Sequence, residues 1–206
     1  MPRSVICVSH ESGAGGQELA IGVAERLGYR IVDEEVVAHA ANREQVTVEQ
    51  LADVERRKSF FTRAMTDFGT SGAVGFGAGS VPPELLNIPT PRQLRAAIRT
   101  AIEEIAGGGR VVIVSHAASH ALVGDHVLRV LVVAPGAVRA SRLKQDGTSG
   151  KSLDTAIADE DAGRRSYLKN FYGIDNETPH DYDLVVNTGS IAPTAFIDTV
   201  VAAAEI

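Results

Sequence analysis

Short, continuous apolar runs alternate along the chain with longer segments in which apolar residues recur every three or four positions. Continuous runs are typical of strands buried on both faces of a parallel sheet, and the longer spacing is typical of helices with one apolar face. The runs predict strands at residues 4–9, 29–32, 110–115, 127–133 and 183–187. The spaced segments predict helices at residues 17–27, 34–67 (mainly helical), 91–106, 135–144, 152–171 and 193–205.

The alternation of strands and helices predicts the fold class. Such alternation is typical of an α/β fold, in which one doubly wound, five-stranded parallel sheet carries helices on both faces. No internal repeat or linker divides the chain, so we expect a single domain over residues 1–206. Ligands of such sheets bind at the carboxyl ends of the strands. The residues placed there are 10–16, 33, 115–118, 134–136 and 187–189.

A glycine-rich loop follows the first predicted strand. The segment His10–Gly16, HESGAGG, has three glycines in its last four residues, and glycine permits backbone angles and close approaches that side chains block. The next helix has Leu19, Val23 and Leu27 on one face and ends before Gly28. A glycine loop that opens a helix directs backbone N–H groups and the positive end of the helix dipole at one point. This arrangement predicts an anion site, most often for phosphate.

Two other segments predict mobile loops. Residues 69–80, GTSGAVGFGAGS, are too rich in glycine to hold a helix or strand, and residues 145–152 lie between two predicted helices. We expect the two segments to close on a bound ligand as an acceptor-side flap and a lid.

Composition narrows the class of protein. The 44% apolar and 22% charged residues are those of an ordinary globular protein, and no apolar run reaches the roughly 18 residues of a membrane helix. The formal net charge of −6 argues against a nucleic-acid partner. The N-terminus has no signal-peptide pattern and Cys7 is the single cysteine, so we expect a cytoplasmic protein with Cys7 in its core. Phe60, Phe61 and Phe68 predict either core packing or a homo-oligomer contact.

Four segments, in this order, resemble a known family. They are the glycine loop, RVVIVSHAASHAL at 110–122, VLRVLVVAPGAVRASRL at 127–143, and DEDAGRRSYLKNFYG…DYDLVVNTGSI at 159–191. They are similar to the cytidylate kinase-like family, relatives of bacterial CMP kinase, over nearly the whole chain. The resemblance implies a P-loop nucleoside-monophosphate-kinase fold. It also implies a phosphotransferase that uses ATP and Mg²⁺ to phosphorylate a nucleoside monophosphate or a similar small acceptor.

The resemblance implies roles for individual residues. The cofactor-binding phosphate loop would comprise Ser12, Gly13, Ala14, Gly15, Gly16, Gln17 and Glu18. The acceptor region would include Asp33, although the sequence alone fits a cap of the next helix equally well. The motif after the third strand falls on residues 115–117. The catalytic lid residues would be Arg139, Arg142, Asp161 and Arg164. Their grouping on two neighbouring elements at the ligand end favours phosphate contact for the arginines over surface ion pairs, and we expect Asp161 to orient Arg164 or Arg165 by pairing with it.

The chain departs from the phosphate-loop pattern at the charged positions. In GxxxxGK[ST], Lys reaches the β and γ phosphates and Ser or Thr binds Mg²⁺. This chain has Gly16 at the lysine position, followed by Gln17 and Glu18, so it has neither the lysine nor the hydroxyl side chain of the motif and carries a carboxylate instead. The family commonly has arginine where this chain has His10, Gln17 and His116. We expect His10 and His116 to bind substrate phosphate when protonated. We also expect weaker phosphoryl transfer than from a complete motif.

Alternative interpretations remain open. The lid arginines favour a phosphotransferase, whereas the missing lysine favours a nucleotide-binding module that kept the fold and lost turnover. The glycine loop also fits an NAD-binding fingerprint, because Asp33 lies about 20 residues after Gly13, although Glu18 stands where a third glycine is expected. His116 and His120 have the spacing of a metal-ligand pair, but no nearby carboxylate or cysteine completes a set, so no metal site is predicted.

Overall fold

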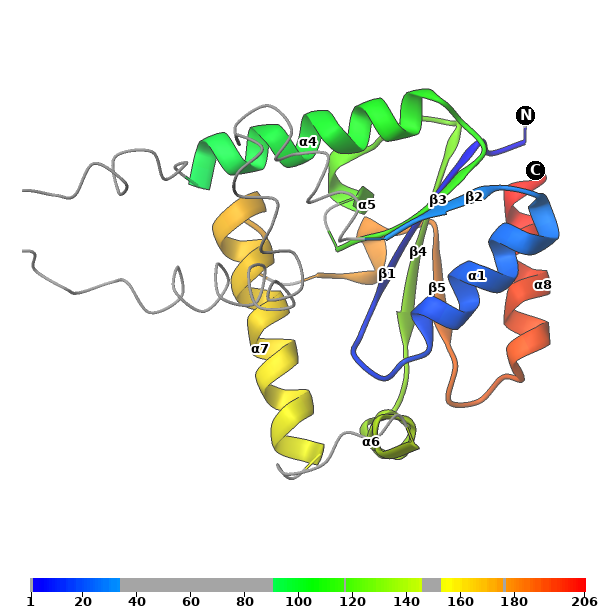
Figure 1. The fold of residues 1–206 in the computed structure, drawn as a ribbon. Helices are drawn as coiled ribbons and strands as arrows, with labels where there is room; N and C mark the ends of the chain where they lie inside the picture. The colour runs from blue at the N-terminus through cyan, green and yellow to red at the C-terminus, as the bar shows by residue number, and fades with distance from the viewer. Residues whose placement is uncertain (1, 34–90, 117, 146–152, 176) are drawn as a thin grey trace, which may run out of the picture.

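The computed structural model describes residues 2–33, 91–116, 118–145, 153–175 and 177–206. The predicted helical region 34–67, the glycine-rich segment 69–80 and residues 146–152 of the predicted lid loop lie outside the described residues. In the described ranges, strands and helices alternate as the apolar pattern predicts (Figure 1).

One parallel sheet of five strands forms the centre of the molecule, as predicted. The strands are β1 (Val5–His10), β2 (Arg30–Val32), β3 (Val111–Val114), β4 (Val127–Val133) and β5 (Leu184–Asn187). Their order across the sheet is β2-β3-β1-β4-β5, and every neighbouring pair is parallel. The chain leaves β1 toward one edge of the sheet and leaves β4 toward the other edge. The carboxyl ends of β1 and β4 therefore flank a switch point, where open α/β sheets bind ligands.

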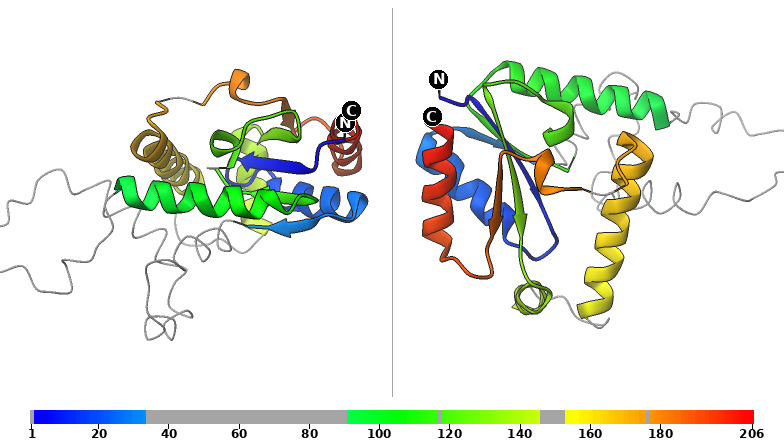
Figure 2. Two further views of the ribbon diagram at one scale, coloured as in Figure 1. Left: turned by 90° about the horizontal axis from the view of Figure 1, so that it is seen from above. Right: turned by 180° about the vertical axis from the view of Figure 1, so that it is seen from behind.

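Helices cover both faces of the sheet. On one face lie α1 (Gly16–Leu27) and α8 (Pro193–Ala204), and on the other lie α4 (Pro91–Gly107) and the short α5 (Ala118–Ala121) (Figures 1 and 2). Helix α6 (Gly136–Gln145) follows the carboxyl end of β4 and packs against α7 (Leu153–Tyr172). None of the helices in the described residues is both long enough and apolar enough to cross a membrane.

Strand β1 shows why the strand sequences are continuous apolar runs. Val5 and Cys7 pack in the core formed with α4, whereas Ile6 and Val8 pack in the core formed with α1 and α8. Successive strand residues point to opposite faces, and both faces are covered, so each of these positions is apolar. Cys7 is a fully buried core residue, as predicted, and burial raises the pKa of its thiol to about 12.

The helix boundaries follow the signals read from the sequence. Helix α1 is followed by Gly28, which takes a left-handed φ of 64°, and α4 begins at Pro91. Two short elements were not predicted, namely α5 and a 3-10 helix at Pro179–Asp181. A single turn is too short to show a three-to-four apolar periodicity, which explains both omissions.

Candidate anion-binding site

The chain turns sharply in the glycine loop, residues 11–16, between β1 and α1. Ala14 N donates a hydrogen bond to Glu11 O at 3.0 Å, and Gly13 and Gly15 take positive φ angles of 71° and 81°. A Cβ atom on Gly13 would lie 2.7 Å from the backbone oxygen of Arg139 in α6. The backbone angles and the close approach of α6 therefore both require glycine here.

The start of α1 has the geometry that the sequence predicts for an anion site. Within the described ranges, no side chain caps this helix end, and the first hydrogen bond at its start runs from Leu19 N to Gly15 O at 3.2 Å. The N–H groups of Gly16, Gln17 and Glu18 consequently have no partner at i−4 in the helix. Such N–H groups at the positive end of a helix favour a bound anion.

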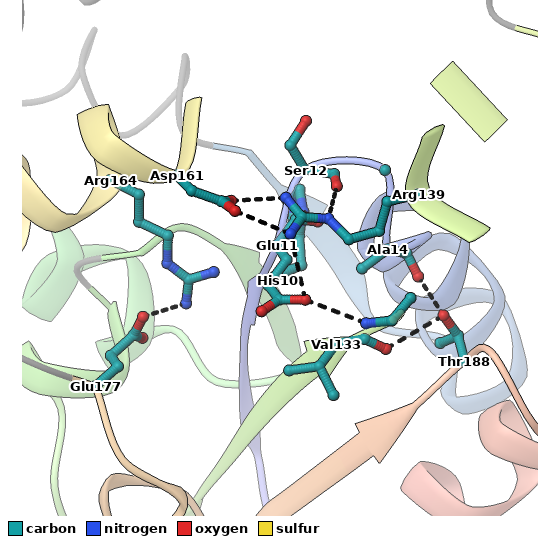
Figure 3. A network of polar contacts seen from close by, with 12 residues as sticks. His10, Glu11, Ser12, Ala14, Val133, Arg139, Asp161, Arg164, Glu177 and Thr188 are labelled. Atoms are coloured by element: carbon teal, nitrogen blue, oxygen red, sulfur yellow. Dashed lines mark hydrogen bonds and ion pairs between the residues drawn. The ribbon is translucent and has the colours of Figure 1, made fainter. Parts of the chain in front are cut away.

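Two arginines of α6 hold carbonyl groups of the glycine loop. Arg139 donates from Nε to Ser12 O at 2.5 Å, and Arg142 donates from Nη1 to Ala14 O at 2.9 Å. Figure 3 shows Arg139 next to Ser12. In a trans peptide, the C=O group and the following N–H group point in opposite directions. The N–H groups of Gly13 and Gly15, which follow these two carbonyls, are therefore turned away from the arginines.

Arg139 is itself fixed by a carboxylate on α7. It is 5% exposed, and its Nη1 and Nη2 bind the two carboxylate oxygens of Asp161 at 3.0 and 2.6 Å (Figure 3). The prediction that Asp161 orients Arg164 or Arg165 is wrong. Those arginines lie three and four residues along the same helix, whereas the packing of α6 on α7 brings the guanidinium of Arg139 directly to Asp161.

Arg142 is fixed by a residue that sequence reasoning did not single out. Its Nη1 donates to Thr188 Oγ1 at 2.8 Å and its Nη2 donates to Thr188 O at 3.1 Å. Thr188 follows β5, is 4% exposed, and donates from Oγ1 to Ala14 O at 2.6 Å (Figure 3). Its position at the carboxyl end of a strand was the one available signal. Arg142 and Thr188 together tie the glycine loop to the end of the sheet.

The ring of His10 covers the start of α1. A Cβ atom on Gly16 would lie 2.4 Å from both Cβ and Cγ of His10. Residue 16 therefore cannot carry a side chain while His10 keeps this position. Because Gly16 stands where a complete phosphate loop has lysine, the imidazole occupies the space through which that lysine side chain would leave the backbone.

His10 lies beside His116, which follows the neighbouring strand β3. Their ring centroids are 5.8 Å apart. Burial lowers the pKa of His10, and burial together with the charges of Arg164 and His10 holds the pKa of His116 well below its usual range. Both rings are therefore mainly neutral at pH 7 in the free protein. The structure brings together the two histidines that the sequence placed at this site.

Arg164 of α7 is the third basic side chain at this point. Its Nη2 donates to Ser9 Oγ at 3.0 Å and pairs with the carboxylate of Glu177. Its Nε is buried, and none of the described residues accepts a hydrogen bond from it. Figure 3 shows its guanidinium between Glu177 and His10. Ser9 Oγ, which accepts from Arg164, also lies 3.4 Å from His116 Nδ1. Three nitrogen-bearing side chains thus gather at the carboxyl ends of β1 and β3.

Three further predicted residues lie at the end of β2 and on α1. Asp33 follows β2 at the edge of the sheet, and β3 separates that strand from β1, so Asp33 lies apart from the glycine loop. Gln17 and Glu18 are exposed on the first turn of α1. Glu177 was not predicted, because it lies in the connection between α7 and β5 and no local motif marks it.

Known sequences place the chain in a family. The sequence model of the cytidylate kinase-like family matches residues 5–190. The chain belongs to the cytidylate kinase-like family. The matched region includes all five strands, the glycine loop and the arginines of α6 and α7. No curated protein matches the sequence significantly.

Solved structures share the fold of this family member. An uncharacterised protein from Eubacterium ventriosum superposes with a TM-score of 0.68 at 14% identity, over 98% of each chain. Shikimate kinase from Bacteroides thetaiotaomicron superposes with a TM-score of 0.50 at 16% identity, over 97% of this chain and 94% of that one. At these identities the likeness shows the fold alone.

Proposed function

We propose that this member of the cytidylate kinase-like family is a phosphotransferase that moves phosphate from ATP to a nucleoside monophosphate or a similar small acceptor. The observation that carries the proposal is the start of α1, where N–H groups are left uncapped by the described residues and Arg139 and Arg142 hold the preceding carbonyls. Donors fixed in this way stabilise phosphate charge without reorganising. Membership of the family supports kinase-type chemistry at this position.

The residues at the loop fit ATP and Mg²⁺ through different groups. The N–H groups at the start of α1 fit phosphate oxygens, and Glu18 offers an exposed carboxylate in the first turn. Carboxylate oxygen is a ligand that Mg²⁺ prefers, and in kinases this ion neutralises phosphate charge. Without the ion, the carboxylate of Glu18 repels phosphate. We therefore expect the magnesium complex of ATP to bind more tightly than free ATP.

The basic residues divide into two roles in this proposal. Arg164, with the neighbouring His10 and His116, is assigned to phosphate contact, because its guanidinium keeps donors that the described residues do not use. Arg139 and Arg142 act through the loop whose carbonyls they hold. Asp161 supports Arg139. Asp33 is assigned to the acceptor side because it follows the carboxyl end of β2, on the same side of the sheet as the carboxyl end of β1.

Turnover is expected to be slower than with a complete phosphate loop. Gly16 supplies no cation at the lysine position, and removing one preorganised transition-state donor typically costs about 100- to 1,000-fold in rate. Arg164 supplies part of the missing charge. The two histidines add to it only when they are protonated.

A second candidate function is nucleotide binding without turnover. The packing of His10 over Gly16 favours it, because this packing fills the place of the catalytic lysine with a ring that is neutral at pH 7.

Steady-state assays separate the two functions. ATP with Mg²⁺ is combined with a panel of nucleoside monophosphates, CMP, dCMP, UMP, AMP and GMP, and ADP formation is measured. We expect acceptor-dependent ADP formation with at least one member of the panel. Binding of ATP by calorimetry without any ADP formation supports the second function. The absence of binding at millimolar ATP, with and without Mg²⁺, contradicts both.

A further inference from the structure

Glu177 is the centre of a buried polar cluster next to the anion site. Its side chain is 13% exposed. Its carboxylate pairs with Arg164 Nη2, accepts a hydrogen bond from the Tyr182 hydroxyl, and lies 3.5 Å from Ser9 Oγ and 3.8 Å from His120 Nε2. Partners from β1, α5, α7 and the end of the 3-10 helix therefore converge on one carboxylate.

The segment that follows Glu177 is held in place by its own hydrogen bonds. Thr178 donates from N and Oγ1 to Asp181 Oδ2 at 2.7 and 3.0 Å, which closes a capping box around the 3-10 helix. Tyr182 is 7% exposed, and the next residue, Asp183, pairs with Arg129 of β4 at 2.9 Å. Glu177 thus belongs to a turn that is anchored to the sheet.

Arg164 needs this carboxylate as a counter-charge in its buried position. The residue is 9% exposed, and a buried guanidinium without a counter-charge is strongly unfavourable. Glu177 pairs with Nη2, and Nε has no hydrogen-bond partner among the residues that the structure describes. Figure 3 shows that the guanidinium extends from Glu177 toward His10 and the glycine loop. The pair therefore supplies a counter-charge without using all of the arginine donors.

We propose that Glu177 is a positioning residue, whose carboxylate holds the guanidinium of Arg164 beside His10. The inference rests on the proposed function, because that function places the phosphate of the substrate within reach of Arg164. Glu177 acts through Arg164 and does not touch the substrate. Removing its charge frees the guanidinium to rotate and to leave this place, so the arginine loses its preorganisation for phosphate.

Two readouts on Glu177→Gln test this role. The Arg164 side-chain signals in ¹⁵N NMR, assigned with an Arg164→Lys variant, report whether rotation of the guanidinium is restricted. Titration with inorganic pyrophosphate and with the ATP–Mg²⁺ complex reports phosphate binding. The control is Asp175→Asn, which makes the same change of charge two residues away in an exposed pair with Lys169, where the two side chains are 70% and 68% exposed.

We expect Glu177→Gln to remove the restricted Arg164 signals and to weaken pyrophosphate binding about tenfold, the loss of one charge-assisted contact. The control keeps the signals and changes affinity by less than about twofold. Unchanged Arg164 signals in Glu177→Gln overturn the inference. If the wild type binds pyrophosphate and Glu177→Gln binds it with the same affinity, the inference is overturned as well. If the wild type binds neither probe while Glu177→Gln still releases the guanidinium, the proposed function fails and the positioning of Arg164 by Glu177 stands.

Discussion

The α6 side and the α7 side of the candidate site use buried arginines in different ways. On the α6 side, each guanidinium nitrogen of Arg139 has a partner, because Nε binds Ser12 O and the other two bind Asp161. On the α7 side, Arg164 pairs with Glu177 and Ser9 through Nη2, and within the described part of the chain its Nε has no partner. Both arginines are less than a tenth exposed, so burial does not separate them.

This difference indicates that the ability of a buried arginine to bind a ligand depends on its unused N–H donors and not on its place in a motif. Arg139 and Arg142 spend their hydrogen bonds on the glycine loop and its supports, so they shape the anion site through backbone geometry. Arg164 stands beside two histidines with a donor still unused. Four predictions, from the largest expected effect to the smallest, test this contrast.

Arg139→Ala tests whether the α6 side is structural. The variant leaves Asp161 and the carbonyl of Ser12 without the buried guanidinium, so we expect the free energy of unfolding to fall by about 3–5 kcal/mol. Urea denaturation measures it. Arg26→Ala is the control, because Arg26 pairs with Asp198 at 3.0 Å with side chains 56% and 58% exposed. Its loss should stay below about 1 kcal/mol. Equal small losses in both variants contradict a structural role for Arg139.

Gly16→Ala tests the packing of His10 over α1. The added methyl group collides with the His10 ring, so we expect a loss of about 1–3 kcal/mol in the free energy of unfolding. In a His10→Gly background the same change should cost almost nothing, because both the ring and the Cβ atom that collide with the methyl group are gone. A double-mutant cycle by denaturation measures the coupling. Additive effects indicate that His10 does not occupy this space.

Arg142→Lys tests whether Arg142 supports the loop or acts as a charge on phosphate. A single ammonium cannot hold Ala14 O and both oxygens of Thr188 in the fork geometry of arginine. We expect the lysine variant to weaken ATP–Mg²⁺ binding as much as Arg142→Ala does, by about tenfold for a lost charged hydrogen bond. Calorimetry measures both. If lysine preserves the wild-type affinity, Arg142 acts mainly through its charge.

The pH dependence tests the histidine side. The pKa values of His10 and His116 are lowered by burial from 6.5, so the folded state binds fewer protons than the unfolded state below that pH. Their contribution to stability is therefore complete above about pH 6.5 and is lost as the pH falls toward the folded-state values. Bound phosphate favours the charged rings. The affinity for pyrophosphate should therefore rise as the pH falls through the same range.

Thermal unfolding and pyrophosphate titration between pH 7.5 and 5.5 measure these two opposite trends. His10→Arg carries a permanent charge, so it should strengthen binding at pH 7.5 and flatten the pH dependence. Pyrophosphate affinity that does not change with pH in the wild type shows that neither histidine binds phosphate.

Much of the fold follows from local sequence. The apolar runs predicted all five strands, because strands covered on both faces must be apolar at successive positions, as in β1. Gly28 and Pro91 marked helix boundaries through backbone angles that they adopt most readily. The glycine loop predicted the turn into α1, since Gly13 and Gly15 take positive φ angles. Each of these signals acts within a few residues, so one sequence is enough to read it.

The partners of the charged side chains were decided by tertiary structure. Asp161 was expected to pair with Arg164 or Arg165, one turn along its own helix, but it binds Arg139 of α6. Thr188 lay in the range 187–189 expected at the carboxyl ends of the strands, but its bonds to Arg142 were not predicted, and Glu177 joined the site although no motif marked it. Sequence spacing shows only neighbours on one element. Which buried guanidinium meets which carboxylate depends on how α6, α7 and the sheet pack together, because a buried charge is stable only beside the partner that packing delivers.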